Sequence, residues 1–131
     1  MLNSRPLILA LALALPGTSA LAADPRTEDE IRHLLAFIET SGCTFIRNGN
    51  EYPSDEARDH IAMKYGYVRK KAESSEDVIR YVATKSSMTG RIYTVRCDGG
   101  EIPSAQWLTQ ELKTYRTSGL ASGVGPNQTP H

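Results

Sequence analysis

The sequence predicts a small α+β domain, in which an antiparallel sheet of about three short strands is packed by about four helices. Three observations support this fold class. Four segments place apolar residues at the spacing of a helix face, and short runs of β-branched and aromatic residues separate them. An Asn-Gly pair at residues 48–49 is typical of a tight turn between antiparallel strands. Two cysteines, Cys43 and Cys97, can form one disulfide between two strands of the sheet.

The first 22 residues predict a secretory signal peptide. Arg5 precedes an unbroken apolar run over residues 7–15, Pro16-Gly17 interrupts it, and an A-x-A cleavage pattern ends at Ala22. The apolar run is far shorter than the roughly 20 residues that a membrane-spanning helix needs. We therefore expect export to the periplasm, cleavage after Ala22 and no stable membrane insertion of the mature chain.

In an oxidising compartment, a lone pair of cysteines indicates a disulfide between Cys43 and Cys97. Closing a loop of this length stabilises a protein by roughly 4 kcal/mol in the chain-entropy model. The alternative is a redox-active pair, which usually has the two thiols close together, as in C-x-x-C. The wide separation of these cysteines favours the structural bridge.

The first helix is expected over residues 27–41. A capping box from Thr27 to Glu30 predicts its start, and Gly42 is a suitable residue for its C-terminal end. One apolar stripe follows the helical period, formed by Ile31, Leu34, Leu35 and Ile38.

A β-hairpin is expected after this helix. Its first strand covers residues 43–47, residues 48–49 form the turn, and a short return strand at 51–52 ends at Pro53. A second helix then starts with Ser54 as its cap and reaches about Lys71.

A third, shorter helix starts at residues 74–77 and leads into a polar loop at 86–90. The strongest strand signal covers residues 91–97, and residues 101–103 are extended after a turn. Ser104 is expected to cap the last helix. A single domain over residues 23–116 and a disordered tail over 117–131 complete the predicted organisation.

The composition excludes several functional classes. Fifteen basic and fifteen acidic residues give no electrostatic footprint for nucleic acid. No H-E-x-x-H, C-x-x-C or Walker spacing indicates a metal or a cofactor, and no catalytic residue is assigned. Glu56 and His60 lie one helical turn apart, which can hold a metal but is also a common surface pair.

Several motifs together resemble the YfeK-like proteins, a family of small exported bacterial proteins of unknown function. The resemblance spans roughly residues 31–116. It depends on C-T-F-I-R-N-G at 43–49, followed by Tyr52, Glu56-Ala57, His60 and Lys64, then S-S-x-T-G-x-x-Y at 86–93 and Trp107-Leu108. Thr89 replaces a serine that is sometimes seen there, which keeps the hydroxyl. The resemblance implies a periplasmic protein and a shared fold, and it implies no activity.

These motifs define a set of candidate ligand-binding residues, namely Arg47, Asn48, Glu56, His60, Lys64, Ser86, Ser87 and Tyr93. If the loop at Ser86 folds over the second helix, these side chains meet in one polar patch. The patch either binds a small anionic ligand or holds the hairpin to the helices through hydrogen bonds.

Three functions are therefore compared. The leading hypothesis is a non-enzymatic binding module of the bacterial envelope, whose partner is an envelope protein or a small anionic ligand. The alternatives are a purely structural or regulatory interaction protein, and a small envelope-acting enzyme that uses His60 with Ser86 or Ser87. The enzyme hypothesis requires a histidine nitrogen within about 3 Å of a serine hydroxyl.

Overall fold

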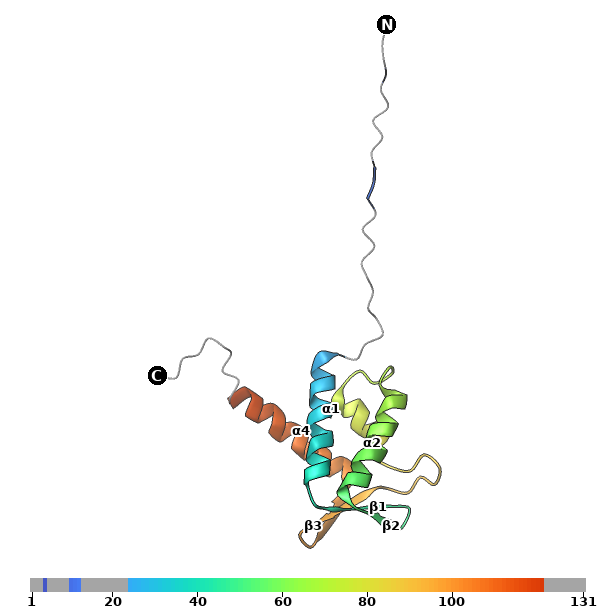
Figure 1. Cartoon of the computed structure of the whole chain (residues 1–131), viewed down its shortest axis with the longest axis vertical. Coiled ribbons are helices and arrows are strands. Elements are labelled where there is room, and N and C mark those ends of the chain that lie inside the picture. The colour runs from blue at the N-terminus through green and yellow to red at the C-terminus, as the bar shows by residue number, and fades with distance from the viewer. Residues whose placement is uncertain (1–3, 5–9, 13–23, 122–131) are drawn as a thin grey trace, which may run out of the picture.

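The structure, a computed structural model, describes residues 4, 10–12 and 24–121 (Figure 1). Most of the predicted signal peptide and residues 122–131 lie outside this part of the chain. In chain order, the elements are α1 (Pro25–Thr40), β1 (Thr44–Arg47), β2 (Asn50–Tyr52), α2 (Ser54–Val68), α3 (Ser75–Val82), β3 (Thr94–Cys97), β4 (Gly100–Pro103) and α4 (Ser104–Ala121). This arrangement confirms the predicted α+β class.

The four strands form one antiparallel sheet in the order β2-β1-β3-β4. Phe45 of β1 lies opposite both Tyr52 of β2 and Val95 of β3, so the middle of the sheet carries large apolar side chains. The segment predicted only as extended at 101–103 pairs with β3 and makes the sheet one strand wider than expected. Asn48 and Gly49 both have positive φ, at 51° and 80°, which confirms the predicted hairpin turn.

The strand predicted over residues 91–97 is shorter than expected and starts at Thr94. The residues before it pair elsewhere, because the Tyr93 amide donates to the Thr84 carbonyl at 3.0 Å and Ile92 forms a bridge with Lys85. This pairing turns the start of the predicted strand toward the segment that follows α3. It also brings Tyr93 next to α2.

A disulfide joins Cys43 and Cys97, whose Cα atoms are 4.8 Å apart. The two residues lie next to the paired residues Thr44 and Arg96 of the neighbouring strands β1 and β3. The predicted bridge is therefore confirmed, and it fastens the centre of the sheet at one end.

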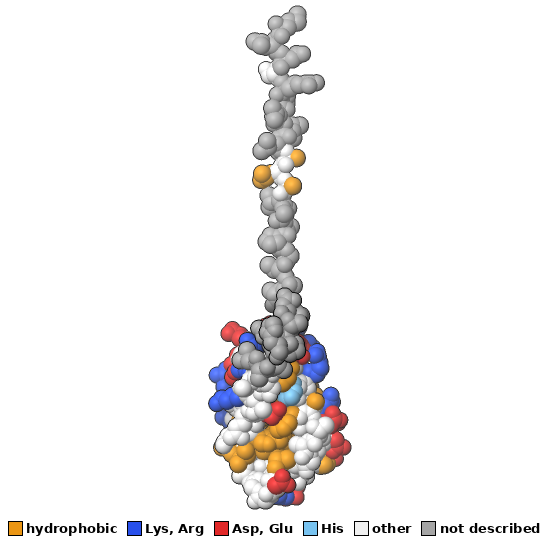
Figure 2. All heavy atoms as spheres, turned by 90° about the vertical axis from the view of Figure 1, so that its left-hand side faces the viewer, with side chains coloured by type: hydrophobic (Ala, Val, Ile, Leu, Met, Phe, Trp, Pro, Cys, Tyr) orange, Lys and Arg blue, Asp and Glu red, His pale blue; other side chains and the backbone are white. Residues whose placement is uncertain are grey.

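The helices gather on one side of the sheet, with α1 and α2 packed together above it in Figure 1. The last helix, α4, packs against α1, α3 and the strands β3 and β4. The side chains most completely buried between these elements include Ile38, Val78, Val82, Val95 and Leu112. Figure 2 views the molecule from the side of α4 and shows further hydrophobic side chains in the lower half of that face, exposed to solvent.

Three helix starts differ from the prediction. Ser104, which was expected to cap the last helix, is the first residue of α4, and its hydroxyl has no hydrogen-bond partner in the described chain. α1 begins at Pro25, where the Asp24 carboxylate accepts a hydrogen bond from the Arg26 amide at 3.2 Å, so the capping box at Thr27 is not formed. Ser54 does not cap α2, because its hydroxyl donates to the Glu39 carbonyl at 3.2 Å. Local sequence favours a cap at these positions, but tertiary contacts and the proline at the first turn decide otherwise. By contrast, α3 starts within the predicted residues 74–77, and the Ser74 side chain caps it.

Two helix ends also differ. α2 ends at Val68, a few residues before the expected end at Lys71. α4 continues to Ala121, past Thr117, where a disordered tail was predicted to begin, and the rest of that predicted tail lies outside the described residues. The Thr117 hydroxyl donates to the Lys113 carbonyl one turn earlier at 2.9 Å, so this hydroxyl has its hydrogen-bond partner within the helix.

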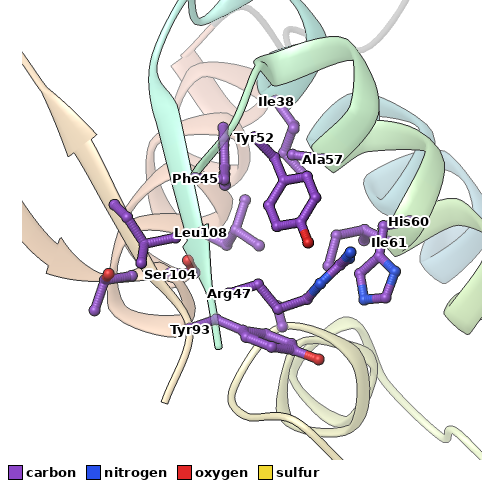
Figure 3. A pocket seen from close by; sticks show the side chains of 13 residues that line it. Ile38, Phe45, Arg47, Tyr52, Ala57, His60, Ile61, Tyr93, Ser104 and Leu108 are labelled. Carbon is purple, nitrogen blue, oxygen red and sulfur yellow. The ribbon is translucent and has the colours of Figure 1, made fainter. Parts of the chain in front are cut away.

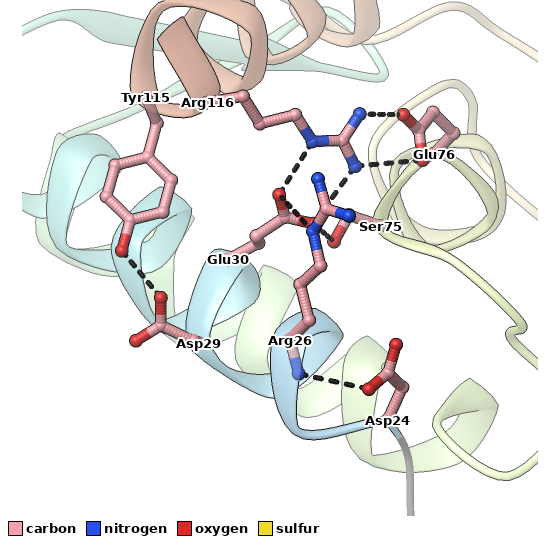
Figure 4. Close-up of polar contacts among 8 residues, drawn as sticks. All are labelled: Asp24, Arg26, Asp29, Glu30, Ser75, Glu76, Tyr115 and Arg116. Atoms are coloured by element: carbon pink, nitrogen blue, oxygen red, sulfur yellow. Dashed lines mark hydrogen bonds and ion pairs between the residues drawn. The ribbon is translucent and has the colours of Figure 1, made fainter. Parts of the chain in front are cut away.

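Glu30, which the sequence assigned to a capping box, is instead the buried centre of a polar network (Figure 4). Its carboxylate accepts hydrogen bonds from Arg116 of α4 and from the Ser75 hydroxyl of α3. Arg116 also pairs with Glu76 of α3. The network therefore joins three helices at the end of the molecule far from the sheet.

Among the described residues, no helix combines the length and the apolar character that crossing a lipid bilayer requires.

Candidate functional site

A small cavity lies where the end of β1, the middle of α2 and the residues before β3 meet (Figure 3). Its free volume is about 30 Å³, enough for one or two water-sized groups. The polar residues Arg47, His60, Thr94 and Ser104 line it, with the two tyrosines Tyr52 and Tyr93. The other lining residues are Ile38, Phe45, Ile46, Ala57, Ile61, Ala83 and Leu108.

Arg47 reaches the cavity because β1 ends there, immediately before the hairpin turn. Its guanidinium lies over the Tyr52 ring, 4.2 Å from the ring centroid, and between that ring and His60 in Figure 3. No carboxylate of the described chain lies within 4 Å of the Arg47 guanidinium. The charge of Arg47 is therefore balanced only by the face of an aromatic ring.

Lys64 lies one helical turn beyond His60 on α2, and it contacts Tyr93, which lines the cavity. The Lys64 Nζ donates to the Tyr93 hydroxyl at 3.4 Å and lies 5.0 Å from the centroid of the Tyr93 ring. Within the part of the chain that the structure describes, Lys64 also has no ion-pair partner. Two cations thus flank the same histidine without a compensating acid.

His60 contacts the edge of the Tyr93 ring, with a centroid separation of 6.1 Å. Its Nε2 atom is buried, and no described residue offers it a hydrogen-bond partner. Burial, together with the charges of Arg47 and Lys64, lowers the pKa of His60 to about 4. The imidazole is therefore neutral at neutral pH and presents an unused ring nitrogen.

Ser104 also lines this cavity, and the sequence did not predict it as a site residue. It is buried, with 4% of its surface exposed, and its hydroxyl has no hydrogen-bond partner in the described chain. Its backbone amide donates to the Tyr93 carbonyl at 2.9 Å, which fixes the start of α4 beside the cavity. A serine after a proline indicates a helix start, and no local signal shows that its hydroxyl stays unpaired.

A separate cluster holds the loop at residues 86–90 on the hairpin turn. The Asn48 amide donates to the Ser86 hydroxyl at 3.4 Å and accepts from the Thr89 hydroxyl at 2.6 Å. The Ser86 hydroxyl also accepts from the backbone amides of Met88 and Thr89, both at 3.3 Å. Asn48 and Ser86 are therefore hydrogen-bonded within the protein, between the hairpin turn and this loop.

Two of the predicted site residues belong neither to the surroundings of the cavity nor to the cluster at the hairpin turn. Glu56 and Ser87 are exposed, and neither forms a hydrogen bond or an ion pair with another described residue. The structure thus brings Arg47, His60, Lys64 and Tyr93 together and leaves Glu56 and Ser87 apart from them.

The geometry required for an enzyme with a His60–serine pair is not formed. Among the described residues, the His60 Nε2 has no hydrogen-bond partner, and the Ser86 hydroxyl bonds to Asn48, Met88 and Thr89 instead. No hydrogen bond connects His60 with Ser87. Nor does any group of three His, Cys, Asp or Glu side chains in the described chain have the arrangement of a metal site.

Comparison with known proteins supports the resemblance that the motifs indicate. Residues 25–116 match the sequence model of a family described as "Family of unknown function (DUF5329)". The chain is also similar to "Uncharacterized protein YfeK" of Salmonella typhimurium strain LT2, with 34% identity over 87 residues, which cover 66% of this chain and 71% of that protein. No solved structure shows significant similarity.

Proposed function

The chain belongs to the DUF5329 family of unknown function, and we propose that it is a non-enzymatic binding module of the bacterial envelope. The proposed ligand is a small anion, held at the cavity that Arg47, His60 and Lys64 border. An anion is favoured because its negative charge would compensate two cations that no acidic side chain among the described residues pairs.

The observation that carries the proposal is the arrangement of charge around His60. A purely structural cluster would normally satisfy its buried polar atoms within the protein. Here the His60 Nε2 is buried and unpartnered, while Arg47 and Lys64 are close enough to hold its pKa down. A bound anion would relieve both the repulsion between the cations and the unmet hydrogen-bonding capacity.

The location in the envelope is part of the proposal and is supported by two features. The sequence of residues 1–22 has the pattern of a signal peptide, and a disulfide such as Cys43–Cys97 persists in oxidising compartments. Fractionation of cells into cytoplasm, periplasm and membrane tests this point directly. We expect a periplasmic protein that begins at Ala23.

Ligand binding is tested by NMR on the 15N-labelled protein. Acetate, phosphate and sulfate are titrated separately, and neutral acetamide serves as the matched control for acetate. We expect saturable shifts of the amides of Arg47, His60 and Lys64 with at least one anion and none with acetamide.

Matched variants assign the effect to the site. Lys64→Met is expected to weaken anion binding about tenfold, which corresponds to the loss of one charge-assisted hydrogen bond. Lys113→Met removes the same charge from an exposed position on α4 and is expected to change nothing. Equal affinities of the two variants, or no saturable shift with any anion, would contradict the proposal.

A further inference from the structure

The inner part of the same cavity points to a particular class of anion, so this inference rests on the proposed function. We infer that the ligand is a carboxylate on a short apolar stem that also carries a hydroxyl or carbonyl oxygen. The carboxylate lies between Arg47 and Lys64, the stem fills the cavity, and the oxygen meets the Ser104 hydroxyl.

The walls of the cavity select the stem. Beyond His60 the lining is almost entirely apolar, with Phe45, Ile61 and Leu108 among its members. Apolar walls stabilise an apolar group and make the burial of an unpaired polar group costly. With only about 30 Å³ of free volume, the cavity accepts a stem of a few carbon atoms and not a long chain.

Ser104 selects the second polar group. Its hydroxyl is buried without a partner, and leaving a buried hydroxyl unsatisfied is unfavourable. Ser104 is also the first residue of α4, where backbone amides have no partner within the helix and the helix dipole is positive. Both features favour a ligand oxygen that accepts a hydrogen bond.

Phosphate and sulfate fit this cavity less well than a carboxylate. Each spreads its charge over tetrahedrally arranged oxygens, so one or more oxygens would face the apolar lining without hydrogen bonds. A carboxylate has both oxygens at one end, which can face Arg47 in the lining and Lys64 beside the lining residue Tyr93, and its uncharged remainder suits the apolar wall. The same chemistry occurs in free short carboxylic acids and at the C-terminus of a peptide that ends in a small residue.

The test compares dissociation constants for acetate, butyrate, 4-hydroxybutyrate and phosphate, measured by NMR on the full protein. Each buried methylene is expected to tighten binding by up to about fourfold, so butyrate binds more tightly than acetate. The terminal hydroxyl is expected to add about fivefold, the usual effect of one hydrogen bond. Phosphate is expected to be the weakest of the four.

Variants at two serines assign the hydroxyl effect. In Ser104→Ala, 4-hydroxybutyrate should lose its advantage over butyrate, whereas the exposed control Ser87→Ala should retain it. The melting temperature of ligand-free Ser104→Ala should be equal to or above that of the wild type, because the substitution removes an unsatisfied hydroxyl. A lower melting temperature with an unchanged hydroxyl advantage would mean that Ser104 is only structural, and it would overturn the inference.

The remaining outcomes separate the two proposals. If phosphate or acetate binds as tightly as butyrate at this cavity, anion binding stands and the inference about the stem is overturned. If no anion binds, the proposed function itself fails.

A further measurement with a dipeptide distinguishes a free acid from a peptide C-terminus as the source of the carboxylate. Alanylalanine offers a terminal carboxylate, a methyl group and a carbonyl oxygen, and its C-terminal amide lacks only the charge. Tighter binding of alanylalanine than of 4-hydroxybutyrate supports the inference with a peptide as the source, and the reverse order supports it with a free acid. Binding of the amide as tight as that of 4-hydroxybutyrate would overturn the inference, because the carboxylate would then be dispensable.

Discussion

Arg116 near the end of α4 binds both carboxylate oxygens of Glu30, the buried acid of α1 (Figure 4). The Arg116 Nε lies 2.6 Å from Glu30 Oε2, and Nη2 lies 3.0 Å from Oε1. The Ser75 hydroxyl donates to Oε1 at 2.8 Å. Because Glu30 is only 3% exposed, its charge depends on these partners rather than on water.

Removing the arginine should therefore destabilise the protein strongly. Arg116→Met leaves a buried carboxylate without its main partner, and we expect the free energy of unfolding to fall by about 3 kcal/mol. Arg26→Met is the matched control, since Arg26 is exposed and its Nε lies 3.7 Å from the same carboxylate. We expect this control to lose less than about 0.5 kcal/mol in urea unfolding. Equal losses would mean that burial does not strengthen the Arg116 pair.

The same pair predicts how stability depends on acid. The hydrogen bonds from Arg116 outweigh burial and hold the pKa of Glu30 below its usual value of 4.5. The folded protein then binds fewer protons than the unfolded chain, so this stabilisation is present above pH 4.5 and is lost as the pH falls further. Urea unfolding at several pH values should show a steeper acid loss for the wild type than for Glu30→Gln. Parallel curves would contradict this assignment.

The histidine at the cavity should titrate far from its ordinary range. We expect a pKa of about 4 for His60 in the ligand-free protein, measured from its ring Cε1 proton by NMR. Arg47→Met and Lys64→Met should each raise this pKa, while Lys113→Met should leave it unchanged. A pKa near 6.5 for His60 would contradict the burial of its ring beside the charges of Arg47 and Lys64.

Protonation of His60 also affects folding, in a different pH window. Its pKa is lower in the folded state, so the unfolded chain takes up the proton first as the pH falls from about 6.5. The His60 contribution is thus expected to reduce stability between about pH 6.5 and pH 4, above the range in which Glu30 acts. The variant His60→Gln should lack this part of the pH dependence.

The disulfide should be a large part of the stability of the domain. The double variant Cys43→Ala, Cys97→Ala is expected to lose about 3–4 kcal/mol in the free energy of unfolding. Mass spectrometry of the protein from the periplasm should show a gain of two hydrogens on reduction. Two free thiols in the unreduced sample would contradict both the bridge and the proposed compartment.

Asn48 has two roles that a pair of variants can separate. Its φ of 51° favours glycine or asparagine, and its side chain bonds to Ser86 and Thr89. Asn48→Gly removes only the side-chain bonds, whereas Asn48→Ala also strains the turn by about 1 kcal/mol. Both should speed amide hydrogen exchange in the loop at 86–90, and the alanine variant should unfold more easily. Unchanged exchange would show that the side chain does not hold the loop.

Much of the fold follows from local signals. The Asn48-Gly49 turn, the apolar stripe of α1 and the single pair of cysteines each have one favoured interpretation, and each is confirmed. The errors occur where tertiary contacts compete with local preference. The spacing of Glu30 from Thr27 fits a capping box, but its carboxylate instead binds Arg116, which is distant in the sequence, and is buried there.

Local signals also predicted part of the candidate site. Helical spacing places His60 and Lys64 on one face of α2, and the hairpin places Arg47 at the end of a strand. Ser104 was missed because its importance depends on what is absent around its hydroxyl, which spacing cannot show. Glu56 lies one helical turn before His60, but its side chain is exposed and does not line the cavity, although the neighbouring Ala57 does.

The most direct test of ligand binding at this cavity is the pKa of His60 in the presence of saturating butyrate. A carboxylate beside the ring favours the protonated imidazole, so the pKa should rise from about 4 when butyrate is bound. Acetamide at the same concentration should leave it unchanged. A His60 pKa that stays the same with butyrate and with acetamide would contradict the account that this cavity binds a carboxylate.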